Sequence, residues 1–171
     1  MAEKYSEVMR GLIQAIMDQE SDFNPNAVSP DGAVGIMQVM PQYAHRYGYG
    51  VPNIFDVADE MGLEPADRSV ASAHQLLLDP VLNERMGTSI LRGLIGHTRG
   101  NLRDALTAYN MGGDAYDDWI AAGANPRSLD EEARHYAPGV YANYQRITGR
   151  QLPEFFHATM PQRRPAGLLA Q

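Results

Sequence analysis

The sequence predicts a single, mostly α domain of about six to eight helices with little or no sheet. Apolar residues recur at intervals of three and four along several segments, which is the spacing of amphipathic helices. Residues that start and stop helices separate these segments. No alternating apolar and polar pattern of useful length is present. The chain has 171 residues, enough for one domain with its own core.

The first helix is predicted close to the N-terminus. Val8, Leu12 and Ile16 share one apolar face, and Glu20 continues that face four residues later. The prolines and glycine of residues 25–32 then interrupt the helical pattern. This arrangement predicts one carboxylate at the end of an apolar-faced helix, just before a turn-rich loop.

The middle of the chain is less regular. We expect a short helical piece over residues 34–43, interrupted near Pro41. Residues 47–67 are predicted to form a loop with one helical turn at residues 55–61. Residues 69–78 are predicted to be helical again.

Two further helices have clear boundary signals. Asp79 and Pro80 open one of them, with the proline at an early position where its missing N–H costs nothing. Its apolar face is formed by Leu82, Met86, Ile90 and Leu94. Asn101 can cap the next helix, with Asp104 three residues later, and Gly112 marks its end.

The last helices lie before residue 150. Residues 114–122 are predicted as a short helix. Residues 128–131 match a capping box that opens a final helix, which Pro138 can kink and Gly149 ends. We therefore expect one domain over residues 1–150 and an extended tail or linker over residues 151–171.

Composition excludes several function classes. The chain has 14 basic and 21 acidic residues and a net charge of −7, whereas nucleic-acid binding needs a basic surface. Without cysteine it has no disulfide, thiol nucleophile or thiolate metal site. The five histidines lack metal-ligand spacing, and no phosphate-binding glycine loop occurs. We therefore expect no metal or cofactor.

Glu20 is the candidate catalytic residue. Its place on an apolar helix face predicts partial desolvation, which raises the pKa of a carboxyl. A carboxyl with a raised pKa can donate a proton near neutral pH. Asp22 and Asp31 are close in sequence, but their turn-like positions favour solvated or structural roles.

The residues around Glu20 and three later blocks carry a family resemblance. The first block consists of Gln19-Glu20-Ser21, Asn24-Pro25, Ala27, Ser29-Pro30, Gly32-Ala33, Gly35-Ile36-Met37-Gln38 and Met40-Pro41. The later blocks are Asp79-Pro80 with Asn83 and Met86-Gly87, then Ala108-Tyr109-Asn110-Met111-Gly112, then Glu132-Ala133-Arg134-His135-Tyr136. In order and spacing they resemble the soluble lytic transglycosylases, which have a goose-type-lysozyme-like fold. The resemblance covers about residues 5–148.

The sequence departs from the family pattern in three places. Ala133 replaces a threonine of the last block, and Asp31 stands where some members carry a small hydroxyl residue. The stretch between Pro41 and Asp79 is longer than usual. It can line or cover the substrate groove, or be a surface insertion.

The resemblance implies a lysozyme-like domain with a substrate groove across one face and a peptidoglycan lytic transglycosylase activity. Such enzymes cleave the β-1,4 bond between N-acetylmuramic acid and N-acetylglucosamine and leave 1,6-anhydro-muramoyl ends. Two alternatives are a hydrolytic muramidase on the same fold and a catalytically silent cell-wall-binding virion module.

The resemblance also implies roles for individual residues. Glu20 would act first as acid and then as base, and the Tyr136 hydroxyl would reach it. Ser29 would bind the muramoyl acetamide. The other implied groove residues are Gln38, Met40, Tyr109, Asn110 and Glu132.

The expected partners follow from that activity. They are the glycan strands of peptidoglycan, together with other virion or cell-envelope proteins, but no nucleic acid. No run approaches the roughly 18 apolar residues of a membrane span, and the N-terminus lacks a secretory signal. We therefore expect action in the periplasm or cell wall after delivery by a phage virion during genome entry, or after export as part of a larger assembly.

Overall fold

The computed structural model describes residues 2–156, with side chains from residue 6 onward, and the fold is all α. Only isolated β-bridges occur in this part of the chain. The helices are α1 (Ala2–Ser21), α2 (Ile54–Glu60), α3 (Val70–Leu77), α4 (Pro80–His97), α5 (Leu102–Met111), α6 (Gly113–Ala121), the 3-10 helix η1 (Pro126–Ser128) and α7 (Glu131–Thr148). The predicted fold class is confirmed.

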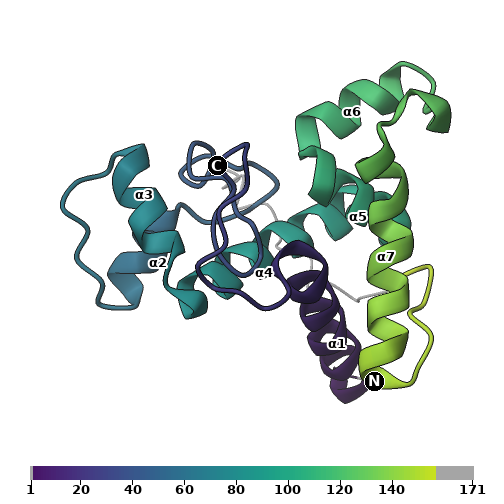
Figure 1. The fold of residues 1–171 in the computed structure, drawn as a ribbon, viewed down its shortest axis with the longest axis horizontal. Coiled ribbons are helices and arrows are strands. Elements are labelled where there is room, and N and C mark those ends of the chain that lie inside the picture. The colour runs from purple at the N-terminus through teal and green to yellow at the C-terminus, as the bar shows by residue number, and fades with distance from the viewer. Residues whose placement is uncertain (1, 157–171) are drawn as a thin grey trace, which may run out of the picture.

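Helix α4 forms the centre of the domain. It runs between the α2–α3 pair on one side and α5 on the other (Figure 1). The side chains of its predicted apolar face are all buried, namely Leu82, Met86, Ile90 and Leu94. Burying a side chain of this size stabilises the fold by about 1.5–3 kcal/mol, so α4 is a firm platform for the segments that surround it.

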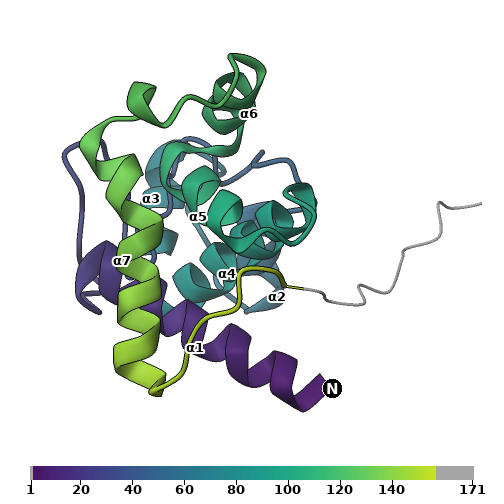
Figure 2. The same ribbon diagram turned by 90° about the vertical axis from the view of Figure 1, so that its right-hand side faces the viewer.

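Helices α1 and α7 pack against each other, and Figures 1 and 2 show them from two directions. Two glycines permit the close approach. A Cβ atom on Gly11 would lie 2.7 Å from Thr148 Cγ2, and one on Gly139 would lie 2.5 Å from Gln19 Oε1. Both distances are shorter than van der Waals contact. The packing brings Tyr136 of α7 to the last turn of α1.

Most predicted helix starts are confirmed by capping hydrogen bonds. The side chains of Ser69, Asp79 and Asn101 accept bonds from the first turns of α3, α4 and α5. The prediction that Ser128 caps the last helix is wrong. Asp130 accepts from Ala133 N at 2.8 Å instead, because Ser128 belongs to η1 and donates to Asn125 O at 2.8 Å.

The helix predicted over residues 34–43 is wrong, because this segment forms turns. Val34 and Val39 exchange two backbone hydrogen bonds of 3.0 Å each. Gly35 and Gln38 have φ values of 80° and 49°, a left-handed conformation that a right-handed α-helix excludes. We call residues 22–41, between the end of α1 and Pro41, the motif loop.

The chain after α7 returns to the domain. Gly149 ends the helix in the left-handed conformation, with φ 68°. Leu152 and Phe156 are buried, and Phe156 N donates to Gly100 O at 2.8 Å. Residues 151–156, predicted to begin a tail, are thus part of the packed structure, whereas residues 157–171 lie outside the described part.

The remaining elements agree with the predictions to within a residue or two. α2 corresponds to the turn expected at residues 55–61, α3 to residues 69–78 and α6 to residues 114–122. In the part of the chain that the structure describes, no helix combines the length and the apolar character needed to cross a membrane.

Candidate active site

Glu20 lies in the last turn of α1 with its side chain half-buried. The hydroxyl of Tyr136 donates a hydrogen bond to Glu20 Oε1. Burial raises the pKa of Glu20 from 4.5 to about 7; the Tyr136 bond opposes this rise, and the nearby charge of Glu132 adds to it. A carboxyl with this pKa is present in both protonation states near neutral pH, as an acid–base group requires.

Two tyrosines form a wall beside this carboxyl. The rings of Tyr109 on α5 and Tyr136 on α7 stack with centroids 6.5 Å apart and 15° between their planes. Tyr109 Oη donates to Met37 O at 3.0 Å. Burial is the main cause that raises the pKa of both hydroxyls well above the usual value, so both remain protonated donors. The wall joins α5, α7 and the motif loop.

Within the motif loop, Ser29 and Gln38 hold the backbone in its turns. Ala33 N donates to Ser29 Oγ at 3.0 Å, and Gln38 Nε2 donates to Gly35 O at 2.8 Å. Among the described hydrogen bonds, the hydroxyl proton of Ser29 and Oε1 of Gln38 have no partner. These two groups are therefore available to a ligand without loss of the loop's own contacts.

Asn83 fastens the motif loop to α4. Its side chain is fully buried, accepts from Met37 N at 2.9 Å, and donates to Val34 O at 2.7 Å and to Leu77 O at 2.8 Å. A Cβ on Gly35 would lie 2.5 Å from Leu77 O, so only glycine fits beside this clamp. Asn83 was part of the resemblance, but no local pattern predicts that it joins the motif loop to α4.

The remaining polar residues near Glu20 in the sequence or in the family resemblance divide into predicted site residues and residues predicted to be solvated. Asn110 Nδ2 donates to Glu132 Oε1 at 3.0 Å across α5 and α7, and Glu132 is close enough to Glu20 to affect its pKa. Asp22 and Asp31, predicted to be solvated, are exposed. The structure thus places Glu132, with its hydrogen bond from Asn110, near Glu20 and leaves the two aspartates in solvent.

Sequence reasoning missed Tyr47, whose hydroxyl contacts the end of the motif loop. Its hydroxyl accepts a hydrogen bond from Met40 N at 3.3 Å, and Met40, a predicted groove residue, is half-buried. Burial is the main cause that raises the pKa of Tyr47 to about 12, and the charge of Glu20 contributes. The only sequence signal was the tyrosine- and glycine-rich character of the segment that follows Pro41.

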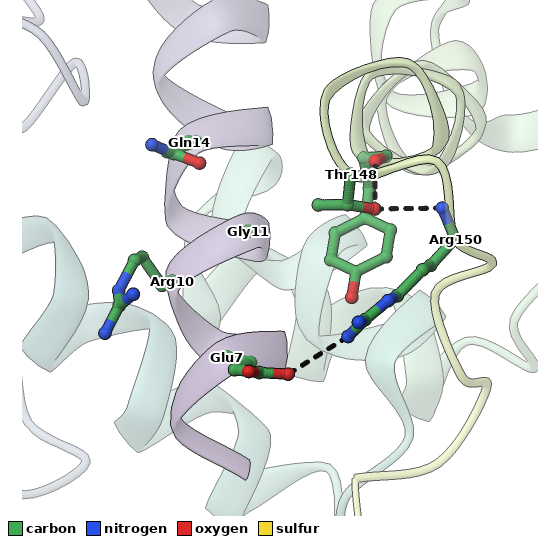
Figure 3. A pocket seen from close by; sticks show the side chains of 7 residues that line it. Glu7, Arg10, Gly11, Gln14, Thr148 and Arg150 are labelled. Carbon is green, nitrogen blue, oxygen red and sulfur yellow. Dashed lines mark hydrogen bonds and ion pairs between the residues drawn. The ribbon is translucent and has the colours of Figure 1, made fainter. Parts of the chain in front are cut away.

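A cavity of about 190 Å³ lies elsewhere, between α1 and the end of α7. Figure 3 shows its ion pair between Glu7 and Arg150, 3.0 Å apart. The lining residues are Glu7, Arg10, Gly11, Gln14, Tyr144, Thr148 and Arg150. None of these is a predicted site residue, so this cavity is separate from the Glu20 site.

The site can therefore supply one titrating carboxyl and several neutral hydrogen-bond donors. Among the described residues, no three His, Asp or Glu side chains gather as a metal ion would require. The donor set suits a neutral polar ligand rich in hydroxyl and amide groups.

We predict that Tyr136→Phe raises the pKa of Glu20 further, because the hydrogen bond that it removes favours the ionised carboxylate. Activity should fall by about tenfold because the carboxyl loses the bond that orients it, and its alkaline limit should move to higher pH because Glu20 keeps its proton longer. A pH–rate profile of the peptidoglycan cleavage that the family resemblance implies measures both effects. An unchanged profile would show that the bond does not influence the titration.

We also predict that burying Glu20 makes the protein less stable as pH rises. The folded carboxyl keeps its proton up to about pH 7, whereas the unfolded one loses it near 4.5. The free energy of unfolding is therefore highest below pH 4.5 and falls by about 3 kcal/mol as pH rises from 4.5 through 7. Urea unfolding at several pH values should show this loss in the wild type and not in Glu20→Gln. Parallel pH dependences would contradict it.

Comparison with known sequences shows the family. Residues 1–129 match the Transglycosylase SLT domain. Membrane-bound lytic murein transglycosylase C of Yersinia enterocolitica is 36% identical over 118 residues, which cover 65% of this chain and 29% of that protein. Soluble lytic murein transglycosylase of Salmonella typhimurium is 31% identical over 118 residues, which cover 69% of this chain and 16% of that protein. The chain spans less than a third of the length of these curated relatives.

Solved structures show the same fold. The 70 kDa soluble lytic transglycosylase Slt70 of Escherichia coli matches with a TM-score of 0.59 and 24% identity over 90% of this chain and 26% of its own. Lytic transglycosylase Slt of Pseudomonas aeruginosa matches with a TM-score of 0.56 and 24% identity, over 90% of this chain and 25% of its own. It was solved as an inactive glutamate-to-glutamine mutant. The chain therefore belongs to the Transglycosylase SLT domain family and shares the all-α fold of Slt70.

Proposed function

We propose that this protein is a peptidoglycan lytic transglycosylase. The observation that carries the proposal is the half-buried Glu20, with its pKa near 7 and its hydrogen bond from Tyr136. The relatives named as lytic murein transglycosylases support it. So does the structurally similar Slt, which is inactive with glutamine in place of a glutamate.

In the proposed reaction, Glu20 acts twice on one N-acetylmuramic acid residue. It first gives its proton to the glycosidic oxygen, and the bond from that oxygen to the muramoyl C1 breaks. The C6 hydroxyl of the same sugar then bonds to C1, and its proton passes to the Glu20 carboxylate. The enzyme is regenerated, no water is consumed, and a 1,6-anhydro end is left.

One carboxyl is sufficient in this scheme because the acetamide of the sugar stabilises the cationic centre, a known exception to the two-carboxylate rule. Glu132 is exposed and accepts a hydrogen bond from Asn110, so we assign it to substrate binding. A hydrolytic muramidase would instead need a water molecule as nucleophile.

The remaining roles are also proposals. The free hydroxyl proton of Ser29 and the free Oε1 of Gln38 would bind the acetamide and a neighbouring sugar. Met40 would offer a polarizable apolar surface. Tyr109, Asn110 and Tyr136 would line the groove from α5 and α7. We place this catalytic unit within residues 1–150 and its action at the cell wall.

Digestion of purified sacculi followed by mass spectrometry tests the proposal. Anhydro-muramoyl ends are the expected product. Reducing muramoyl ends would identify a hydrolytic muramidase and overturn the proposed chemistry. Binding to sacculi without release of fragments would indicate a non-catalytic module.

A further inference from the structure

The hydroxyl of Ser21 joins the end of α1 to the motif loop. Ser21 directly follows Glu20 in the chain and is the last residue of α1. Its Oγ donates to Met17 O, one helical turn earlier, at 3.1 Å and to Ile36 O of the motif loop at 2.9 Å. Shared hydrogen bonds of this kind are common at helix ends. One side chain thus fastens the helix that carries Glu20 to the loop.

The acceptor in the motif loop depends on Ser21. Ile36 is half-buried and lies 15 residues further along the chain. Among the described hydrogen bonds, its carbonyl oxygen accepts only the one from Ser21. Removing the hydroxyl would therefore leave this carbonyl without a partner, which costs free energy where the group is shielded from water. No other described side chain duplicates this link.

The two residues after Ser21 adopt a conformation that needs support. Asp22 and Phe23 have φ values of 51° and 61°, in the left-handed region that residues other than glycine seldom occupy. Backbone of this kind persists only where the surroundings hold it. Phe23 N donates back to Met17 O at 3.3 Å, which closes the helix locally. The Ser21 bond adds a support from the motif loop at the same point.

The motif loop is also held at the residue after Ile36. Met37 N donates to Asn83 on α4 at 2.9 Å, and Met37 O accepts from Tyr109 on α5 at 3.0 Å. At residues 36 and 37 the loop is thus bonded to α1, α4 and α5. Without the Ser21 hydroxyl it would keep the bonds to α4 and α5 and lose only the one to α1. The change would therefore fall on the position of the helix end that carries Glu20.

We propose that Ser21 is a positioning residue, which holds Glu20 in register with the motif loop. This inference rests on the proposed function. The loop carries the free ligand groups of Ser29 and Gln38, and a sugar bound there must present its glycosidic oxygen within hydrogen-bond reach of Glu20. A small misplacement of a reacting group can cost about a hundredfold in rate. Ser21 itself touches no reacting atom in this scheme.

Cleavage kinetics on soluble peptidoglycan strands test the proposal. Ser21→Ala should lower kcat by about tenfold, because Glu20 is no longer held in register. KM should change by less than about twofold, because the loop keeps its bonds to α4 and α5. Ser21→Thr retains a hydroxyl and should restore most of the rate. A Ser21→Ala protein whose kcat equals that of the wild type would overturn the inference.

Thr98→Val is the matched control. Thr98 makes the same kind of shared bond at the end of α4, where it donates to Leu94 O at 2.9 Å and to Asn101 O at 3.0 Å. It has no described hydrogen bond to α1 or to the motif loop. Its removal should lower stability by an amount similar to that of Ser21→Ala and leave kcat unchanged. Equal losses of kcat in the two variants would show an effect of stability alone and would refute the positioning role.

A titration of the Glu20 carboxyl carbon by NMR tests the link without substrate, with the signal identified by its absence in Glu20→Gln. Releasing the end of α1 should admit water to the carboxyl, so its pKa should fall by about one unit from about 7. Ser21→Cys, whose thiol donates weakly, should shift it in the same direction and decides the matter if Ser21→Ala does not fold. Titrations identical to that of the wild type in every folded variant would overturn the inference. A wild type that fails to cleave peptidoglycan would overturn the proposed function alone.

Discussion

Glu20→Gln is expected to lower the rate of peptidoglycan cleavage by about a thousandfold, because general acid–base catalysis contributes factors of this order. Glutamine has the same shape and can still accept the hydrogen bond from Tyr136, but it cannot donate a proton to the glycosidic oxygen or take one back. The fold should remain intact, since the neutral amide avoids burying a charge. Release of soluble fragments from purified sacculi measures the rate.

The matched control for this substitution is Asp22→Asn, which removes a carboxylate two residues away. Asp22 is exposed, and surface substitutions of this kind change free energies by less than about 0.5 kcal/mol. Its activity should therefore stay close to that of the wild type. A Glu20→Gln protein that is folded and clears cell wall at the wild-type rate would remove Glu20 from the mechanism.

Asn83→Ala is expected to give the largest loss of stability, about 3–5 kcal/mol. The substitution leaves Met37 N and Leu77 O buried without the partner that Asn83 now provides. It also removes one of the two hydrogen bonds to Val34 O, which still accepts from Val39 N. Each buried polar group without a partner costs about 1–3 kcal/mol, and the missing side-chain atoms leave a cavity. Urea unfolding monitored by circular dichroism measures the change.

Asn143→Ala serves as its control. Asn143 lies on α7 and donates one exposed hydrogen bond of 3.2 Å to Gln19, so its removal should cost less than about 1 kcal/mol. If Asn83→Ala were no more destabilising than Asn143→Ala, the clamp between α4 and the motif loop would not have the importance that we give it.

The helices could be predicted from the sequence because each has a local cause. Ser69, Asp79 and Asn101 cap helix starts with their own side chains, and apolar spacing identifies the buried face of α4. Where two local signals compete, this reasoning fails. Both Ser128 and Asp130 can cap a helix, and only the 3-10 turn at residues 126–128 decides between them.

The motif loop could not be predicted because its conformation depends on distant residues. The spacing of Met37 and Met40 is that of a helix. The hydrogen bond from Met37 N to Asn83, 46 residues later, instead holds the backbone in turns. Tyr47 was missed for a similar reason, since the turns between Met40 and Arg46 bring its hydroxyl back to Met40 N. Family resemblance supplied the pairing of Tyr136 with Glu20, which no local pattern indicates.

We propose that Glu20 alone transfers the proton in both directions while the sugar supplies its own nucleophile. Digestion of sacculi in water labelled with heavy oxygen tests it most directly, by mass spectrometry of the released muropeptides. We predict anhydro-muramoyl ends that carry no label. Heavy oxygen at the muramoyl C1 of the initial products would show that water attacks that carbon, and would rule out the intramolecular reaction.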